Sequence, residues 1–554
     1  MSSTTVPAPA APPAPRRPAT RVSALAGAGV LIRFGLRRDR IRLPVWLISL
    51  TLASALTLRS LADLYDTAEG RASAARTAGS PAAIATSGPR HYLSDYTVGS
   101  MLSHQMLGFT ALLVGLMSVL IVTRHTRAEE ETGRAELLRS AVVGRHAQLA
   151  AALAVAAAAN VGLALLIAGS LAAQGAGSAG LAGALVYGFA HAGVGIAFAA
   201  VAAVTVQTTA HARGASGMAL AVIGLAYALR ATGDVGDGTL SWLSPIGWAQ
   251  RTYAFVDNRW WPILLSLAFA AAVSAVAFPL STRRDVGAGL RPARQGRRSA
   301  SWALTRPAGF ALRLHRGMLL GFGAGLLVLG VMYGSLLGDV EDLLGSLEEY
   351  RRTLEALGGT TVTEAFASMV MLVLAIVAAV QVAMAALRPR AEESAGRAEA
   401  LLATGLSRDR WVLAHVTVGA AGGTLLLLVA GLGFGAAGAV ATGDGSLVWK
   451  LAGAALAYAP ALWFTLGCAV ALFGRLPRQT GLVWLVPVYS FAVGYLGQLL
   501  RFPHWLNNLS PFGHVPRLPA AELEWTPLLV LTALAAGLVW FGLAGFRRRD
   551  LETS

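Results

Sequence analysis

The sequence predicts an all-α polytopic membrane protein with about twelve transmembrane helices, arranged as two tandem six-helix halves. Three observations predict this fold. Hydrophobic residues make up 55% of the 554-residue chain and charged residues only 13%, with a mean hydropathy of +0.58, whereas a soluble domain carries roughly 25% charged residues. Apolar windows of about 20 residues recur along the chain, as spanning helices require. Short motifs also recur about 265 residues apart, which indicates a duplicated unit.

The apolar windows place six spans in each half of the chain. In the first half we expect them at 43–62, 98–123, 147–172, 181–206, 217–232 and 260–281. In the second half we expect them at 317–338, 363–387, 411–441, 449–474, 480–500 and 526–546. The window at 217–232 is short, and Arg230 closes it.

These spans divide the chain into four regions. A Pro/Ala-rich tail at 1–21 is too poor in large apolar residues to build a core, so we expect it to be disordered. A first half at 22–290 and a second half at 317–554 flank an Arg-rich linker at 291–316. Because each half has an even number of spans, both halves share one orientation and are related by a pseudo-twofold axis along the membrane normal. Such symmetry encloses a central path, as in a pore or a transporter.

The charge balance predicts the orientation in the membrane. The chain has 45 basic and 29 acidic residues, a net charge of +16. The basic excess lies on the N-terminal tail, on alternate loops and on the C-terminal tail, so the positive-inside rule places both termini in the cytoplasm of a plasma-membrane protein. A nucleic-acid partner is not needed to explain this charge. The segment 24–42 is predicted to be a basic amphipathic helix at the membrane interface, because the arginines that follow SALAGAGVLI disfavour a signal peptide.

Three motifs are present twice. RAEEETGRAELL at 127–138 matches RAEESAGRAEAL at 390–401 in nine of twelve positions. LSPIG at 243–247 matches LSPFG at 509–513, and RRD at 283–285 matches RRD at 548–550.

The repeated charged loop has two interpretations. It is either a solvated helical turn at the membrane surface or a docking surface for a partner. In both copies a glutamate precedes an arginine by four residues, Glu130 with Arg134 and Glu393 with Arg397, which is the favourable order for an i,i+4 pair on a helix. Because the duplicate kept these residues while the spans diverged, we expect docking.

The doubled RAEExxGRAExL, the segments LRRDRIRLPVW and LRLHRGMLLGF, and the two LSPxG motifs resemble the fused permease subunits of ABC-type exporters of polyketide antibiotics and other drugs. The resemblance implies coupling loops at 124–147 and 388–410 that rest on two copies of a separate ATPase subunit, which binds ATP and Mg. It also implies that 24–42 is an interface helix. The second copy departs from the first at Ser394 and Ala395. The expected coupling residues are Arg127, Glu129, Glu130, Gly133, Arg134 and Glu136, and in the second copy Arg390, Glu392, Glu393, Gly396, Arg397 and Glu399.

The sequence indicates no enzyme, and we expect neither a catalytic residue nor a cofactor or metal in this chain. A phosphate-binding loop requires Gly-Lys-Ser/Thr, and the one lysine, Lys450, lies between Trp449 and Leu451. The single cysteine, Cys468, and the scattered histidines do not form a metal-ligand pattern. A membrane-embedded transferase would need a clustered acidic or histidine site, which the sequence does not show.

The LSPxG segments precede the sixth and twelfth spans. Their proline and glycine suit a broken or re-entrant hairpin that acts as an outer gate, or a plain turn before a helix. The gate would comprise Pro245, Gly247, Pro511 and Gly513.

The predicted function is a permease that exports hydrophobic drugs, with a partner ATPase switching a central cavity between inward-open and outward-open states. By analogy with the family, the cavity would be lined by Gln105, Met106, Phe109, Tyr227, Met369, Gln381, Tyr489 and Gln498. The alternative is an ion- or proton-coupled secondary transporter, which normally needs ionisable groups deep in the membrane. Arg59, Arg230 and Glu364 are instead expected near span ends, which favours the ATP-driven permease.

Overall fold

The computed structural model describes residues 23–79, 81–174, 180–285, 287–290, 298–338, 340, 361–496 and 504–551. These residues form helices joined by turns, without strands, in two compact units, Met1–Arg294 and Gln295–Ser554. Eleven helices in the described part of the chain are long and apolar enough to cross a membrane. The prediction of an all-α polytopic membrane protein is therefore confirmed.

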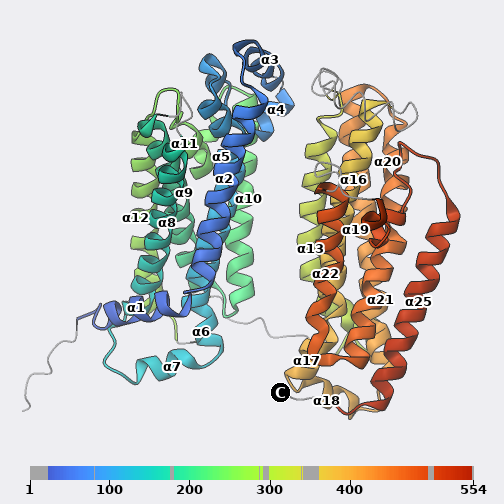
Figure 1. The fold of residues 1–554 in the computed structure, drawn as a ribbon. Coiled ribbons are helices and arrows are strands. Elements are labelled where there is room, and N and C mark those ends of the chain that lie inside the picture. Colours follow the sequence, from blue (N-terminus) through green and yellow to red (C-terminus); the bar gives the residue numbers. More distant parts are fainter. Residues whose placement is uncertain are drawn as a thin grey trace, which may run out of the picture. The chain divides into compact units, whose positions relative to one another are not determined.

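The first unit holds six long helices (Figure 1). They are α2 (Arg42–Leu64), α5 (Val98–His125), α8 (Ala147–Ala173), α9 (Leu181–Thr208), α10 (Ala212–Val235) and α12 (Trp261–Thr282). The short helices α1 (Ala28–Arg38), α6 (Arg127–Glu131) and α7 (Arg134–Arg139) lie at one end of this unit, and α3 (Ala68–Ala78) and α4 (Pro81–Thr86) lie at the other (Figure 1). The remaining short elements are η1 (Arg90–Asp95), η2 (Leu240–Leu243) and α11 (Pro245–Gln250).

Helix α9 is the centre of the first unit. It packs against α5, α8, α10 and α12, and it is apolar around its whole circumference, as expected of a helix surrounded by others. Small residues allow this close approach: a Cβ added at Gly188 would lie 2.4 Å from the carbonyl oxygen of Ala164 on α8. The buried Asn160 of α8 donates to the Ser118 hydroxyl of α5 at 2.9 Å, which adds a polar contact to the apolar packing.

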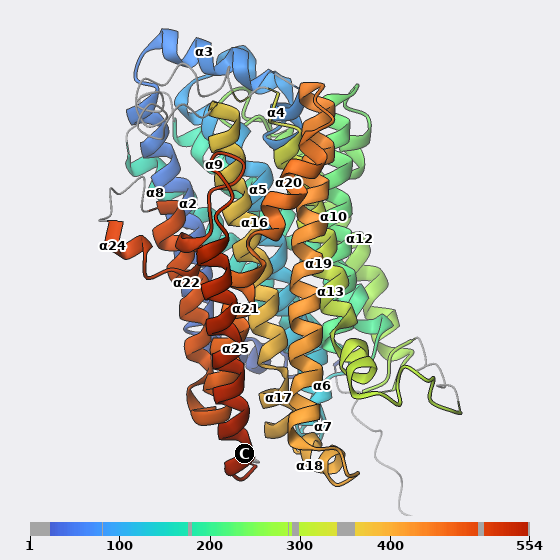
Figure 2. The ribbon, with the colours of Figure 1, turned by 90° about the vertical axis from the view of Figure 1, so that its right-hand side faces the viewer.

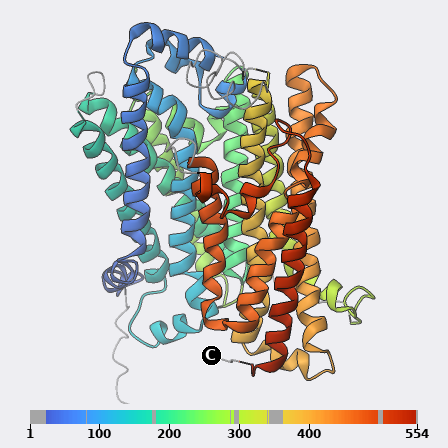
Figure 3. The same ribbon diagram turned by 45° about the vertical axis from the view of Figure 1, so that its right-hand side comes forward.

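The second unit is built from α13 (Pro307–Gly334), α16 (Val362–Ala386), α19 (Arg408–Thr442), α20 (Leu447–Leu456), α21 (Ala459–Arg475) and α25 (Trp525–Arg548). Helices α13 and α19 pack along each other, and so do α21 and α25. Figure 3 shows α25, in red, running along this unit. The short helices α17 (Arg388–Ser394) and α18 (Arg397–Leu402) lie at the same end as the C-terminus (Figure 2). The other short elements are η3 (Pro477–Trp484), α22 (Leu485–Phe491), η4 (Ala492–Leu496), α24 (His504–Asn507) and η5 (Pro511–His514).

Two expected spans differ in extent from the observed helices. Helix α13 begins at Pro307, ten residues before the expected start, because proline is well accommodated in a first helical turn. Helix α10 runs from Ala212 through Arg230 to Val235, so the expectation that Arg230 closes a short span is wrong. The span expected at 449–474 is found at Leu447–Arg475, where α20 and α21 follow each other directly. Pro460 lies in the first turn of α21, where the missing proline N–H is tolerated.

The span expected at 480–500 is not one regular helix. Its described residues pass from the 3₁₀ turns of η3 through α22 into the π-helical η4, and 497–500 lie outside the described residues. Pro487 within this stretch removes one backbone donor, which disfavours a continuous α-helix.

The packing of α9 makes Gly188→Ala a test of this fold. The new methyl group would meet backbone on α8, so we expect destabilisation by about 1–3 kcal/mol. Gly224→Ala on α10 is the matched control, since nothing lies within 4 Å of its Cβ position. Thermal unfolding in detergent should show a lower midpoint for the first variant and an equal or higher midpoint for the second. Equal stability of the two variants would contradict the α8–α9 packing.

Candidate functional site at the charged end of each half

The repeated loop forms two short helices in each half. In the first half α6 and α7 meet at Gly133, and in the second half α17 and α18 meet at Gly396. The φ angles of these glycines are +72° and +70°, and no atom lies within 4 Å of either Cβ position. The left-handed backbone conformation, and not lack of space, therefore explains glycine at both sites.

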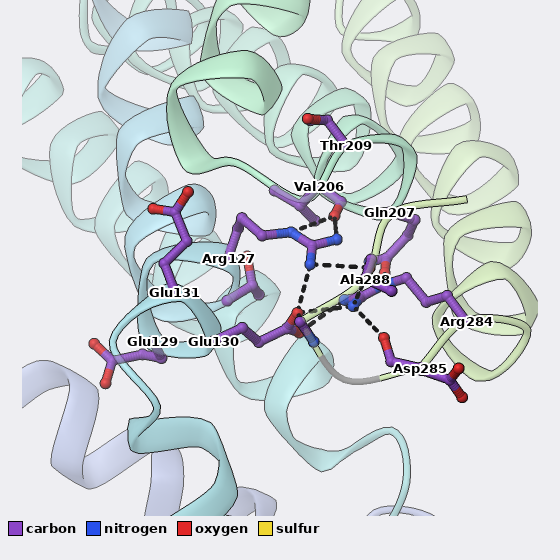
Figure 4. Close-up of polar contacts among 12 residues, drawn as sticks. Arg127, Glu129, Glu130, Glu131, Val206, Gln207, Thr209, Arg284, Asp285 and Ala288 are labelled. Carbon is purple, nitrogen blue, oxygen red and sulfur yellow. Dashed lines mark hydrogen bonds and ion pairs between the residues drawn. The ribbon is translucent and has the colours of Figure 1, made fainter. Parts of the chain in front are cut away.

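In the first half, Glu130 is the centre of a buried ion-pair cluster (Figure 4). Arg284, which follows α12, donates from both terminal nitrogens to the two Glu130 oxygens, each at 2.7 Å. Arg127 donates to the same carboxylate at 2.6 Å. This arrangement joins the loop after the second span to the end of the sixth span.

Arg127 and Arg284 extend the cluster to α9 (Figure 4). The fully buried Arg127 donates from Nε to the carbonyl oxygen of Val206 at 3.1 Å, in the last turn of α9. The Nε of Arg284 donates to the side-chain oxygen of Gln207 at 2.7 Å. A cation at the carbonyl end of a helix is favourable, because those carbonyls have no partner within the helix.

The second half repeats this arrangement at Glu393. Arg549, which follows α25, donates from Nη1 and Nη2 to the two Glu393 oxygens at 2.6 and 2.8 Å. Arg390 donates to Glu393 at 3.4 Å. The Arg549 guanidinium also lies 5.0 Å from the ring centres of Phe473 and Phe546, whereas Arg284 in the first half contacts the side chain of Gln207. The RAEE and RRD motifs are thus in contact in both halves.

The i,i+4 pairs expected in the loops are wrong. Glu130 pairs with Arg127 and Arg284, and Arg134 lies beyond the turn at Gly133. In the second half Arg397 pairs with Glu392 at 2.5 Å. This hydrogen bond raises the pKa of Arg397 above its ordinary value. The physical reason is the left-handed glycine, which ends the first short helix. The arginine that follows the glycine is therefore not one helical turn away from the glutamate on the same helix.

Glu129 and Glu392 form the remaining buried contacts of the loops. Glu129 pairs with Arg38 at the end of α1. The neighbouring Asp39 accepts from His125 at 2.6 Å. The two contacts join the predicted interface helix to α6 and to the end of α5. Glu392 pairs with Arg388 at 2.8 Å as well as with Arg397.

The expected coupling residues therefore fall into two groups. Buried or half-buried side chains form the ion-pair frame of each half, comprising Arg127, Glu129, Glu130, Arg390, Glu392 and Glu393. The exposed or half-exposed group lies at and after the glycine turn, comprising Gly133, Arg134, Glu136, Gly396, Arg397 and Glu399. Leu137 extends the exposed group, with 75% of its surface accessible. Sequence reasoning missed Arg284 and Arg549 as site residues, although their duplicated RRD motif was visible.

The expected cavity residues are distributed over both units. In the first unit, Gln105 donates to the Tyr96 hydroxyl at 3.4 Å and Tyr227 donates to the carbonyl oxygen of Thr86 at 3.2 Å. Burial raises the pKa of Tyr96 to about 12, so this hydroxyl stays neutral. Met106 is half-buried, whereas Phe109 is 52% exposed.

In the second unit, Gln381 is fully buried and its amide atoms have no hydrogen-bond partner in the described structure. Met369 is exposed, and Tyr489 donates to the carbonyl oxygen of Leu506 at 2.7 Å. Gln498 lies outside the described residues.

The two LSPxG segments are capped helical turns. Ser244 accepts from the backbone N–H groups of Ile246 and Gly247, and Pro245 begins α11, which is buried among α5, α9, α10 and α12. In the second half, Ser510 likewise accepts from Phe512 at the start of η5, which contains Pro511 and Gly513. A serine cap followed by proline is a favourable helix start. The outer gate and the plain turn before a helix both stay predictions.

A buried charge cluster lies at the other end of the first unit. Asp234 and Arg230 are fully buried side chains of α10, with Asp234 3.8 Å from Arg230 and 3.3 Å from Arg251. Arg230 thus lies near the end of α10, as expected, and its side chain is buried there. The guanidinium of Arg230 also lies 4.3 Å from the ring centre of Tyr227.

Comparison with known proteins identifies the family. The model of the multidrug efflux system permease Rv1217c, C-terminal domain, matches residues 32–279 and 304–547, one stretch in each half. The multidrug efflux system permease protein Rv1217c of Mycobacterium tuberculosis is 39% identical over 556 residues, covering 100% of both chains. This chain belongs to the Rv1217c family of multidrug efflux permeases.

Membership of this family confirms the predicted resemblance to a drug-efflux permease. The permease is a multi-pass membrane protein of apolar helices. The family match covers a stretch of similar length in each half, which agrees with the internal repeat seen in the loop motifs.

The buried frame of the permease predicts a large effect of Glu130→Ala on stability. Removing this carboxylate leaves Arg127 and Arg284 without their charge partner, and breaking a buried pair in this way costs about 3–5 kcal/mol. Glu136→Ala is the control, because Glu136 is exposed and exposed ion pairs contribute only about 0–1 kcal/mol. Thermal unfolding should separate the two variants. Equal unfolding midpoints would show that the cluster does not stabilise the fold.

Proposed function

We propose that this permease is the membrane subunit of an ATP-driven exporter of hydrophobic drugs and that two copies of a separate ATPase dock on its charged ends. One observation carries the proposal: each half presents an exposed helical turn, mounted on a buried ion-pair frame, at the same end of its helices. Family membership supports export. The sequence supports a separate motor, because its one lysine is not part of a phosphate-binding loop.

The exposed turns suit a partner protein. Leu137 and Val142 of the first loop are 75% and 77% exposed, and large apolar side chains flanked by charges are typical of protein contacts. The buried frame beneath the turn gives it a defined position, so that little conformational entropy is lost on binding. ATP and Mg would be bound by the partner, and both permease termini would lie in the cytoplasm with the charged ends.

The permease itself would supply the path and two conformations with different substrate affinity, since a ligand can shift an equilibrium only through such a difference. We propose that the side chains named above by analogy with the family line the substrate cavity. Apart from Gln381, those in the described structure are half-buried or exposed. Such residues suit hydrophobic compounds, whereas the buried Gln381 would need a rearrangement to reach them. The helix α11 and its counterpart η5, with Pro245, Gly247, Pro511 and Gly513, would form the outer gate.

A double substitution in the exposed turns tests the docking surface. Leu137→Asp and Ala400→Asp occupy matching positions of the two loops, and both positions are exposed. We expect each change to weaken binding of the ATPase and the pair to weaken it more, because a desolvated carboxylate opposes an apolar contact. The measurement is co-purification of the permease with the products of adjacent genes, tested for ATP binding.

Leu243→Asp is the matched control for this experiment. Leu243 is 67% exposed and follows the far end of α10, so its substitution should leave association unchanged. Full association of the double variant would remove the turns as the docking surface. Absence of any ATPase from the unmodified permease, together with transport that follows a proton gradient without ATP, would contradict the ATP-driven proposal.

The buried Asp234 favours one second candidate, a proton-coupled transporter. Asp234 is a buried carboxylate between Arg230 and Arg251 near the end of α10, and a buried carboxylate of this kind is a candidate proton-binding group. Asp234→Asn separates the two candidates. An ATP-driven exporter should keep ATP-dependent transport in vesicles, whereas a proton-coupled transporter should lose transport driven by the proton gradient.

A further inference from the structure

Arg284 and Arg549 hold equivalent positions in the two halves. Each belongs to an RRD motif just after the last spanning helix of its half, α12 or α25. Each makes a two-bonded contact with the glutamate of the loop after the second span of the same half. The contact therefore links two helices that are far apart in sequence.

The geometry of these pairs makes them rigid links. Two parallel bonds of 2.6 to 2.8 Å fix both the distance and the orientation of the carboxylate against the guanidinium. Both glutamates are buried, and the two arginines are largely buried. If the glutamate and the arginine separate, an unpaired charge is left in a poorly solvated site, which is energetically costly.

Neighbouring contacts hold the first link in place. Arg284 also donates to Gln207 at 2.7 Å, and the backbone N–H of Leu290 donates to the Gln207 carbonyl at 2.9 Å. A Cβ added at Gly289 would lie 2.6 Å from the backbone of Thr209, so the segment after α12 lies directly against the end of α9. Helix α6, the end of α9 and the segment after α12 therefore form one connected body (Figure 4).

We propose that Arg284 and Arg549 are positioning residues for transport: they make each docking loop and the sixth helix of its half move as one unit when the ATPase acts. This inference rests on the proposed function, and it goes beyond it by assigning the path of the movement. The displaced element is then the sixth helix, together with the second helix from which the loop extends. No contact between Arg284 or Arg549 and the substrate is required.

A distance measurement tests joint movement directly. Spin labels are placed at the exposed Thr132→Cys and Thr282→Cys in a Cys468→Ser background, in the permease–ATPase complex reconstituted in lipid. We expect one narrow distance that stays the same with and without ATP. In the Arg284→Ala complex the distance should broaden and change on ATP binding. A distance that changes in the parent complex, or an Arg284→Ala complex identical to its parent, overturns the inference.

Transport per ATP hydrolysed gives a second measurement. Coupling between sites is typically worth roughly 5–150-fold, and we expect Arg284→Ala and Arg549→Ala each to lower drug transport per ATP by about tenfold. Arg283→Ala and Arg548→Ala are matched controls, because these arginines are exposed neighbours with the same charge, and they should keep the ratio. Arg284→Lys keeps the charge but loses the two-bonded geometry, and we expect an intermediate ratio.

The outcomes separate this inference from the proposed function. If the unmodified permease binds the ATPase and Arg284→Ala keeps its transport per ATP, only the inference fails. If the unmodified permease binds no ATPase, the proposed function fails and the inference fails with it. If the alanine variants do not fold, the lysine variants are measured instead. Transport per ATP in a lysine variant equal to that of the parent permease would overturn the inference.

Discussion

The fold of each half depends on one electrostatic constraint at its charged end: a glutamate after the second span must share a buried site with an arginine after the sixth span. Isolated charges are costly in such a site, and the two charges become tolerable only as a pair with further hydrogen bonds. Glu130 meets this requirement with Arg284 and Arg127, and Glu393 meets it with Arg549 and Arg390. The first and last parts of each half are thereby joined.

This constraint gives the retained residues of the repeated loop two separate roles. The glutamates and the first arginine of each copy face inward and hold the helix ends together, whereas the residues after the glycine face outward. Glycine separates the two groups because its left-handed conformation ends the first short helix and changes the direction of the chain. The loop is therefore neither a simple solvated turn nor a contact surface along its whole length.

Buried polar groups also organise the opposite end of the first half. Ser241 donates to the Asp234 carboxylate at 2.7 Å, and Ser244 caps α11. Gln250, Tyr227 and Arg230 donate to the carbonyls of Ser87 and Thr86, which anchors the chain after α4 to α10 and α11. Packed polar side chains therefore satisfy the carbonyls of the irregular backbone at this end of the unit.

The sequence by itself determined the class of protein, the positions of most spanning helices, the internal repeat and the family. Apolar length and repeated motifs are local properties, so they can be counted along the chain. Only the tertiary structure decided which charges are paired. The expected partner of Glu130 was Arg134, four residues away, but the observed partner Arg284 is 154 residues away. Proximity of that kind depends on helix packing, which brings the ends of α6 and α12 together and buries Arg230 and Asp234 where the sequence had indicated only a span end.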